Sequence, residues 1–410
     1  MPASSAGAPA PHVSAMSPAL IVLVLSLLLG LQPITTDLYL PSLPALTEGF
    51  GATLPQAQLT LSALLLAFGL SQLVWGPLSD RYGRRPILVW GLGAYVLASV
   101  VSTLAPSMTL LIVARILQGA AMGAAVMCAR AIVRDLYRPV DGARVMSKGL
   151  TGLGVIACLS GPLGGLLAGW AGWRIALLAL AVFGAGTLAL VLLRFEETLR
   201  QRNPKALQPA TLLQTWRDIV RHPTFWAYSA LSAASYGGLF TVLASSSFVF
   251  IQVLGLSRPS YGLIMSTVSG TYIIGTLICR RLLPRWGVRR TVAVAAGFTL
   301  TGGTLMGVFA FTGLHNGWAI MLPFYLFMLA HGVHQPCSQS GAVSPFPYAA
   351  GAASALNGFL MAATSFIVGA VLGETMDGTV RPLMYGVCFW SVMIALSAWT
   401  LVQKHGKLGH

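Results

Sequence analysis

The stretch of sequence that decides the fold is a short polar turn, which reads Gly76-Pro77-Leu78-Ser79-Asp80-Arg81-Tyr82-Gly83-Arg84-Arg85-Pro86. Gly76 would let two helices approach closely, and Gly83 permits a tight turn. Asp80 could accept hydrogen bonds from helix-terminal N–H groups or pair with an arginine. Arg84 and Arg85 are expected to anchor the turn at a cytoplasmic membrane face, where basic residues concentrate. The stretch therefore predicts a tight turn between two membrane-spanning helices.

The composition around this turn is that of a membrane protein. Hydrophobic residues make up 56% of the chain, charged residues only 9%, and the mean hydropathy is +0.76. Soluble domains carry about 25% charged residues, so the exterior of this protein must face the lipid bilayer. The net charge of +15 does not indicate nucleic-acid binding, because the basic residues lie in loops beside apolar runs, where they orient the protein and meet anionic lipid.

Apolar runs long enough to cross a bilayer lie on both sides of the turn and recur along the chain. A crossing needs about 20 mostly apolar residues. We predict an all-α membrane protein of twelve transmembrane helices, at residues 18–40, 56–78, 86–105, 107–129, 145–170, 174–194, 223–247, 260–280, 288–311, 317–337, 349–373 and 381–403.

The basic residues crowd into every second gap between these runs. With the N-terminus inside the cell, 21 of the 25 Lys and Arg residues fall on the cytoplasmic side. Only Arg174, Arg258 and Arg381 fall on the other side, and Arg115 lies inside a predicted span. Cytoplasmic loops carry the excess of Lys and Arg. Both termini are therefore predicted to be cytoplasmic.

The longest polar gap divides the chain into two sets of six spans, and a basic gap follows the second span of each set. Such a duplication is typical of transporters, whose binding site lies between the halves near the midplane. The predicted organisation is a disordered cytoplasmic tail, a six-helix half, a cytoplasmic linker, a second six-helix half and a short cytoplasmic tail, at residues 1–17, 18–194, 195–222, 223–403 and 404–410.

Two predicted spans carry unusual residues. Arg115 and Gln118 lie inside span 107–129, and an intramembrane charge is normally kept only where it faces a cavity or a partner. The alternative is a helix-packing arginine satisfied by backbone carbonyls. Span 145–170 contains Gly161-Pro162 and Gly164-Gly165. Gly-Pro should bend the helix, and the glycines would let the two halves pack closely, or serve ordinary small-residue packing.

These motifs resemble those of the major facilitator superfamily. The turn follows its signature loop, G-x-L-x-D-R-x-G-R-R, and Arg115-Ile116-Leu117-Gln118-Gly119 is similar to its R-x-x-Q-G motif. The resemblance implies a role in proton coupling for Arg115 and Gln118. The segment Ala157–Gly165 is similar to the motif of proton-driven antiporters, with Ala157 in place of its first glycine. The corresponding loop at residues 280–290 lacks the aspartate.

Three further segments narrow the resemblance to the Bcr/CflA group of drug/proton antiporters. They are D-x-Y-L-P-x-L-P at residues 37–44, the stretch Arg130–Leu136, and the stretch Ala350–Leu356. The resemblance covers essentially the whole chain. It implies a bacterial inner-membrane protein, and it does not identify a substrate.

The predicted proton carrier is Asp37, because it is the one acid of ten that is plausibly embedded in a span. A carboxyl group in low-dielectric surroundings favours its protonated form and could alternate as water access changes sides. The alternative is a helix-end residue near the outer surface. If the first span starts at residue 18, Asp37 lies about 28 Å along it, and Arg115 sits about 10 Å deeper.

The candidate substrate cavity combines aromatic and polar side chains from several spans. Two histidines three residues apart share a helix face, but two imidazoles do not complete a metal site, and no metal is predicted. Tyr236 and Phe240 could line an apolar cavity or face lipid. The proposed lining residues are Tyr39, Tyr236, Phe240, His331, His334 and Gln335.

The functional prediction is proton-coupled efflux of small amphipathic drugs or metabolites by a monomer, through alternating access. Asp37 would exchange a proton for a substrate, Arg115 would bias that exchange, and the turn from Gly76 to Arg85, including Asp80, Arg81, Gly83 and Arg84, would latch the inward-closed state. The alternative is import of a soft metal ion or small nutrient on the same fold. No enzyme constellation, Walker loop or cofactor motif is present in the sequence.

Overall fold

The computed structural model describes residues 16–406, apart from residues 138, 200, 203, 205 and 348. Most of the predicted N-terminal tail, residues 1–15, and the end of the C-terminal tail, residues 407–410, lie outside the described residues. The side chains of residues 139, 140, 143, 209 and 211 are likewise not described.

The first half of the chain is a run of helices joined by short connections. In order, its elements are α1 (Pro18–Asp37), the short 3₁₀ turn η1 (Leu40–Ser42), α2 (Leu43–Gly49), α3 (Leu54–Tyr82), α4 (Arg84–Leu104), α5 (Met108–Leu136), α6 (Pro139–Trp170) and α7 (Trp173–Arg194).

The second half follows the same pattern after an interfacial helix. Its elements are α8 (Pro209–Arg221), α9 (Pro223–Ser247), the π-helical turn η2 (Phe248–Val253), α10 (Arg258–Thr312), α11 (Gly317–Val343), α12 (Ala350–Thr375), α13 (Arg381–Leu396), the π-helical turn η3 (Ser397–Leu401) and α14 (Val402–His405). No strand occurs in the part of the chain that the structure describes.

The described helices supply twelve membrane crossings, which confirms the predicted fold class. Eleven helices are long and apolar enough to span a bilayer. One of them, α10, has 55 residues and would extend about 80 Å if straight, far more than a hydrocarbon core of about 30 Å. Its backbone leaves the helical region at Gly287, with φ 67° and ψ 172°. This helix therefore contains two crossings that meet at Gly287.

The first crossing is longer than the predicted residues 18–40. Ser17 caps α1 by accepting a hydrogen bond from the Leu20 N–H, and the helical path continues through η1 and α2 to Gly49. Asp37 therefore lies about 28 Å from the start of this segment and about 18 Å from its end. Asp37 is the last residue of α1, but it is not the end of the crossing, because the helical path continues past Pro41 and Pro44.

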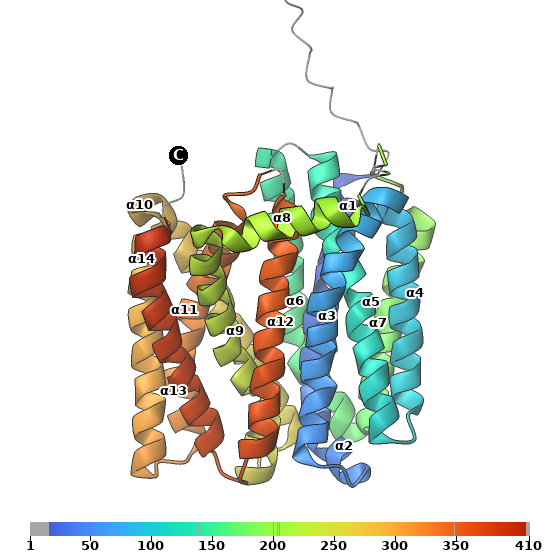
Figure 1. The fold of residues 1–410 in the computed structure, drawn as a ribbon. Helices are drawn as coiled ribbons and strands as arrows, with labels where there is room; N and C mark the ends of the chain where they lie inside the picture. The colour runs from blue at the N-terminus through green and yellow to red at the C-terminus, as the bar shows by residue number, and fades with distance from the viewer. Residues whose placement is uncertain are drawn as a thin grey trace, which may run out of the picture.

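The two six-helix sets lie side by side, the first toward the blue-green side of Figure 1 and the second toward the yellow-red side. Helix α3 packs on α12, and α6 packs on α10, which makes two seams between the halves. A Cβ on Gly69 of α3 would lie 2.4 Å from the Ala362 Cβ of α12. Small residues therefore permit this close helix approach, as is common in membranes.

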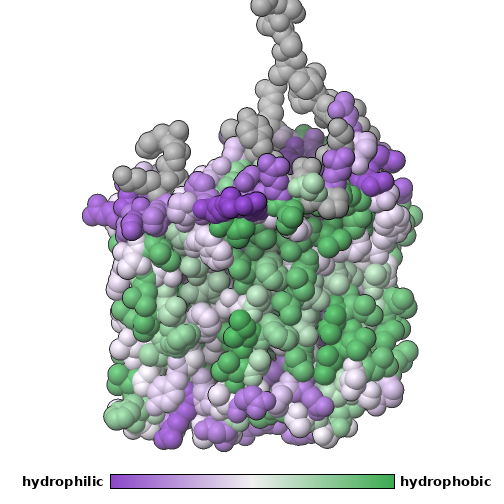
Figure 2. Space-filling model, viewed as in Figure 1, coloured by the Kyte–Doolittle hydropathy of each residue, from purple (hydrophilic) through white to green (hydrophobic). Residues whose placement is uncertain are grey.

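The surface matches a bilayer environment. Figure 2 shows apolar residues across the middle of the viewed face, with hydrophilic residues gathered at both ends. Helix α8 crosses one end of the bundle, packed against α9 and α12 (Figure 1). We call this the basic end; it also carries the turns at Gly83 and Gly287. The predicted linker at residues 195–222 therefore contains a helix of its own.

Candidate functional site

The turn at the basic end leaves a single residue between α3 and α4. Gly83 adopts φ 108° and ψ 164°, a backbone conformation that favours glycine. A Cβ at this position would also lie 2.3 Å from Oε2 of Glu197. Glycine is therefore required here both by the backbone and by the neighbouring side chain.

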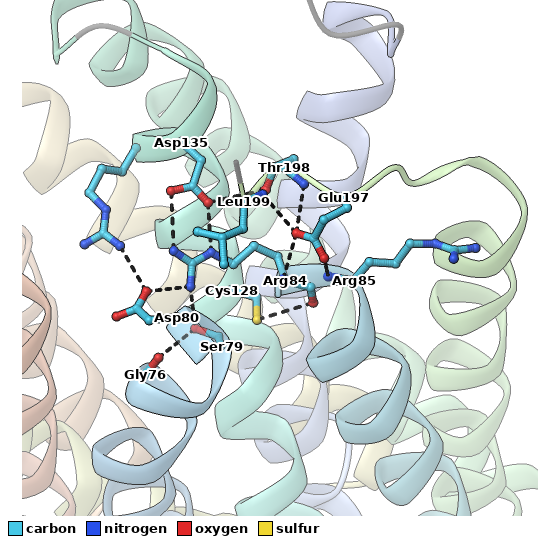
Figure 3. A network of polar contacts seen from close by, with 11 residues as sticks. Gly76, Ser79, Asp80, Arg84, Arg85, Cys128, Asp135, Glu197, Thr198 and Leu199 are labelled. Atoms are coloured by element: carbon cyan, nitrogen blue, oxygen red, sulfur yellow. Dashed lines mark hydrogen bonds and ion pairs between the residues drawn. The ribbon is translucent and has the colours of Figure 1, made fainter. Parts of the chain in front are cut away.

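Arg84 is the centre of an ionic network (Figure 3). Its guanidinium donates to both oxygens of Asp135, at 2.8 and 3.4 Å, and its Nη1 donates to Asp80 Oδ1 at 2.7 Å and to Ser79 Oγ at 2.7 Å. Bidentate arginine–carboxylate pairs are among the stronger protein hydrogen bonds. The network therefore joins the ends of α3, α4 and α5.

Of the two arginines expected to anchor the turn at the cytoplasmic face, Arg84 is buried and Arg85 is exposed. The Arg84 side chain is only 1% exposed, because as the first residue of α4 it lies among the ends of α3 and α5. Arg85 is exposed and donates to the Leu192 carbonyl at 3.1 Å, and Arg81 is exposed with its guanidinium over the Tyr82 ring. Of the two partners predicted for Asp80, the structure contains the arginine, and Arg134 adds a second contact at 3.6 Å.

Glu197 is a member of this network that the sequence did not reveal. Its Oε1 accepts from the backbone N–H groups of Arg84, Thr198 and Leu199, each at 2.9 Å, and its Oε2 accepts from that of Arg85 at 3.1 Å. A carboxylate at a helix N-terminus satisfies otherwise unbonded N–H groups and meets the positive end of the helix dipole. Because Glu197 follows α7, it ties the start of the linker to the turn (Figure 3).

The close packing predicted at Gly76 is not present. The nearest atom to a Cβ there would be Met127 Cε at 3.4 Å, an ordinary contact with a flexible side chain. The Gly76 carbonyl accepts a hydrogen bond from Ser79 Oγ at 2.8 Å. Gly76 therefore supports Ser79 without enforcing a close helix approach.

Arg115 lies fully buried inside the first half. It donates to the Thr60 carbonyl at 3.3 Å, to Gln118 Oε1 at 2.6 Å and to the Thr35 carbonyl at 3.1 Å. The guanidinium carbon also lies 4.3 Å from the centre of the Tyr39 ring, a cation–π contact. The guanidinium therefore connects α1, α3 and α5 through neutral partners.

Gln118 and Tyr39 extend the same cluster. Gln118 Nε2 donates to Ser99 Oγ of α4 at 2.6 Å, and the Tyr39 hydroxyl donates to Thr60 Oγ1 at 2.7 Å. These two predicted residues therefore lie with Arg115 in one polar core. The backbone-satisfied arrangement considered from the sequence is present, and the coupling role of Arg115 remains a prediction.

Asp37 is not part of this core. It is half-buried at the end of α1 and accepts a hydrogen bond from Thr36 Oγ1 at 2.8 Å. Among the described residues, no basic side chain forms an ion pair with it. Its carboxyl is close enough to interact electrostatically with Tyr236 on α9, Tyr261 on α10 and Cys158 on α6. Asp37 therefore lies near residues of both halves, and the structure does not pair it with Arg115.

The glycines of α6 lie against neighbouring backbones. A Cβ on Gly161 would lie 2.9 Å from the Gly262 carbonyl oxygen of α10, and one on Gly165 would lie 2.4 Å from that of Arg258. The corresponding distance for Gly164 is 2.2 Å to the Leu38 carbonyl oxygen beside α1. Helix α6 continues through Pro162 as one α-helix. The predicted antiporter motif thus forms part of the seam between α6 and α10.

The remaining cavity candidates lie in the second half, and several point to separate neighbours. Tyr236 is half-buried beside Gln32, and Phe240 is buried beside Gly369 of α12. His331 pairs with Ser235 Oγ at 2.8 Å and His334 with Thr299 Oγ1 at 3.1 Å.

Gln335 is buried and donates to the Ser232 carbonyl at 3.3 Å. His331 and Gln335 therefore bond to neighbouring residues of α9, whereas His334 bonds to α10. Within residues 16–406 as described, no group of three or more His, Cys, Asp or Glu side chains is arranged to hold a metal ion.

Two six-helix halves, a charged turn at one end and an unpaired acid between the halves define a multi-pass membrane transporter. The family model of the Major Facilitator Superfamily matches residues 25–370. The chain belongs to this superfamily, as its motifs predicted.

Several curated proteins are similar to this chain over most of its length. The multidrug resistance protein D of Escherichia coli (strain K12) is 29% identical over 390 residues, which cover 94% of this chain and 98% of that protein. A chloramphenicol resistance protein of Pseudomonas aeruginosa is 29% identical over 377 residues, which cover 91% of this chain and 86% of that protein.

Solved structures share the fold at lower identity. The crystal structure of a D-xylose–proton symporter matches with a TM-score of 0.75 and 17% identity, covering 95% of this chain and 99% of that one. At this identity the likeness shows the fold alone.

Proposed function

We propose that this protein is a proton-coupled exporter of small amphipathic drugs or metabolites in the inner membrane of a bacterium. The observation that carries the proposal is the carboxyl of Asp37, which lies in the first crossing without an ion-pair partner among the described residues and near residues of both halves. The names of the resistance proteins to which the chain is similar favour export. His331 and His334 do not support the importer alternative, because each forms a hydrogen bond with a different neighbour, Ser235 or Thr299.

In this mechanism Asp37 carries the proton. When the outer side is open, the carboxyl takes up a proton; when the inner side is open, it releases the proton and cargo enters. Proton and cargo then compete for one region between the halves, and this competition couples the two fluxes. Because proton and cargo compete at Asp37, this mechanism does not require a second acidic residue in the membrane-spanning helices.

Arg115 positions the segment that carries Asp37. Its Nη2 donates to the carbonyl of Thr35, two residues before Asp37, and its guanidinium lies over Tyr39, two residues after it. The guanidinium therefore holds both flanks of the acid without neutralising it. Gln118 fixes the guanidinium through its 2.6 Å bond.

The turn at the basic end would latch the inward-closed state. Arg84, Asp80, Asp135 and Glu197 hold the ends of α3, α4 and α5 and the start of the linker as one unit. A latch of this kind lets the first half move as a rigid body against the second, which is how alternating access operates in such transporters.

The organisation that we propose follows the predicted division at residues 18–194, 195–222 and 223–403, with the basic end facing the cytoplasm. The partners are protons, a small-molecule substrate and the lipid bilayer, and the protein acts as a monomer without cofactor or nucleic acid. Both termini are then cytoplasmic, on the side that basic residues prefer.

The test is transport by purified protein in proteoliposomes under an imposed pH gradient, with chloramphenicol as the probe. We expect the gradient to drive its movement in the native protein and Asp37→Asn to abolish that dependence. The matched control is Asp377→Asn, in the loop between α12 and α13, where a hydrogen bond from Thr379 lowers the pKa of the carboxyl. Transport that ignores the gradient, or that keeps its gradient dependence in Asp37→Asn, would exclude the proposed coupling.

A further inference from the structure

Three arginines of α4 and α5 differ in how well their charge is satisfied. Arg84 makes four side-chain hydrogen bonds, three of them to carboxylate oxygens. Arg115 makes three and lies against an aromatic ring. Arg130 has a single partner among the described residues: its Nη1 donates to Ser354 Oγ at 2.7 Å.

The single bond of Arg130 crosses between the two halves. Arg130 lies six residues from the end of α5, about 9 Å from that end, and Ser354 lies near the start of α12. Both positions are close to the basic end, where cargo would enter during export. Arg130 is half-buried, so it is neither enclosed like Arg115 nor free in solvent.

A guanidinium carries five N–H donors, and one neutral hydroxyl leaves most of them without a protein acceptor. Membrane-embedded charge is costly and is usually retained for function. Arg130 is therefore placed to receive an acceptor that the protein itself does not supply.

A second unsatisfied polar atom lies one helical turn deeper on α12. Asn357 is 3% exposed, its Nδ2 makes a long 3.4 Å bond to Ser232 Oγ of α9, and its Oδ1 has no hydrogen-bond partner. Residues three apart share a helix face, so Ser354 and Asn357 lie on the same side of α12. A buried acceptor without a donor costs free energy unless a ligand satisfies it.

We propose that Arg130 selects cargo by charge. Its guanidinium receives a carboxylate or similar anionic group of the cargo near the basic end, where Arg130 of α5 meets Ser354 of α12, and Asn357 accepts a hydrogen bond from a hydroxyl or amide N–H of the same molecule. Ser354 holds the guanidinium in place until cargo arrives. This inference rests on the proposed export function and adds a substrate class to it: amphipathic compounds with an acidic group.

The experiment compares three probes in proteoliposomes under the same pH gradient: fluorescein, which is anionic, chloramphenicol, which is neutral, and ethidium, which is cationic. The amount of each probe inside the proteoliposomes is measured after the vesicles are lysed at one fixed pH. A hydrogen bond to a charged group contributes about 1.5–3 kcal/mol, which corresponds to about a 10- to 100-fold change in affinity. We therefore expect Arg130→Gln to lower fluorescein transport at least about tenfold and to leave chloramphenicol and ethidium nearly unchanged.

Two further variants separate charge recognition from structure. Arg130→Lys keeps the charge and should keep most of the fluorescein transport. Arg280→Gln is the matched control, because Arg280 of α10 also bonds to a serine of the other half, Ser147 at 3.0 Å, but is exposed. It should change the three probes equally or not at all.

The outcomes are distinguishable from failure of the export proposal. If the native protein moves chloramphenicol with the gradient but discriminates against fluorescein, or if Arg130→Gln lowers all three probes alike, charge selection by Arg130 is wrong while export stands. If no probe responds to the gradient, fluorescence polarisation of fluorescein with the purified protein decides. Fluorescein binding that depends on Arg130 would then support the anion site but not proton-coupled export. If such binding is absent as well, both the anion site and the export proposal are wrong.

Discussion

The turns at Gly83 and Gly287 occupy matching places in the two halves, and both glycines combine a positive φ with an extended ψ. Gly83 has φ 108° and ψ 164°, and Gly287 has φ 67° and ψ 172°. An aromatic residue precedes each glycine, and an arginine lies over each ring, at 5.5 Å for Tyr82 and 5.7 Å for Trp286. The two turns therefore share a positive-φ glycine and an aromatic residue covered by an arginine.

The side chains that hold the two turns differ. Where the first turn has Asp80 and Arg84, the second has Pro284 and Val288. Arg289 instead exchanges hydrogen bonds with Gln403 at the C-terminal helical segment, donating to its carbonyl and accepting its amide at 3.1 Å. Within the described ranges, every ion pair lies in the first half. Among the described residues, ion pairs between helix ends therefore occur only in the first half, which also carries Asp37.

Removing one carboxylate of the first turn should have the largest effect. Asp135→Ala leaves the buried guanidinium of Arg84 with half its charge compensation, and breaking a buried ion pair costs about 3–5 kcal/mol. We expect thermal unfolding of the detergent-purified protein at a clearly lower temperature, and loss of transport. Arg289→Ala in the second turn is the control and should cost much less. Equal losses in the two variants would contradict the comparison.

The two glycines test the comparison directly. Alanine at a position with positive φ and extended ψ costs about 1–3 kcal/mol, and this is all we expect for Gly287→Ala, where nothing lies within 4 Å of the new Cβ. At Gly83 the Cβ would also collide with Glu197, so Gly83→Ala should lose roughly twice as much stability. Thermal unfolding of both variants measures the difference, and a ranking in the opposite order would refute the environment assigned to Gly83.

Glu197→Gln tests whether the charge of Glu197 fixes the start of the linker to the N-terminus of α4. The substitution keeps the side-chain size but removes a charge at the N-terminus of α4, where such a charge contributes about 0.3–1 kcal/mol. We expect a small fall in unfolding temperature and a faster tryptic cleavage of the linker. Glu196→Gln, at the exposed neighbouring residue, is the control. The capping role fails if the two variants behave alike.

The smallest effect should come from the exposed pair of Asp80 and Arg134, at 3.6 Å. Exposed pairs contribute about 0–1 kcal/mol and are screened by salt. Arg134→Gln should therefore lower stability slightly at low salt and not at 1 M salt, while Arg290→Gln in the second turn shows no such salt dependence. Unfolding curves at the two salt concentrations measure this, and a salt-independent loss in Arg134→Gln would remove the ionic explanation.

The sequence by itself determined the number of crossings and the superfamily. Span length is imposed locally by bilayer thickness, so twelve apolar runs could be counted without knowing their packing. The turn residues Gly83 and Arg84 could be recognised for the same reason, since a tight turn and its flanking charges occupy adjacent positions. The local signal also singled out Asp37 and Arg115 as unusual residues of apolar runs.

Only the tertiary structure decided which of these residues meet. Arg84 lies 51 residues from Asp135, its backbone N–H lies 113 residues from Glu197, and Arg130 lies 224 residues from Ser354. These contacts depend on where helices cross and how they rotate about their axes, which packing of side chains against small residues sets. Hydropathy records that a segment enters the membrane, but not which neighbour its polar face will find there.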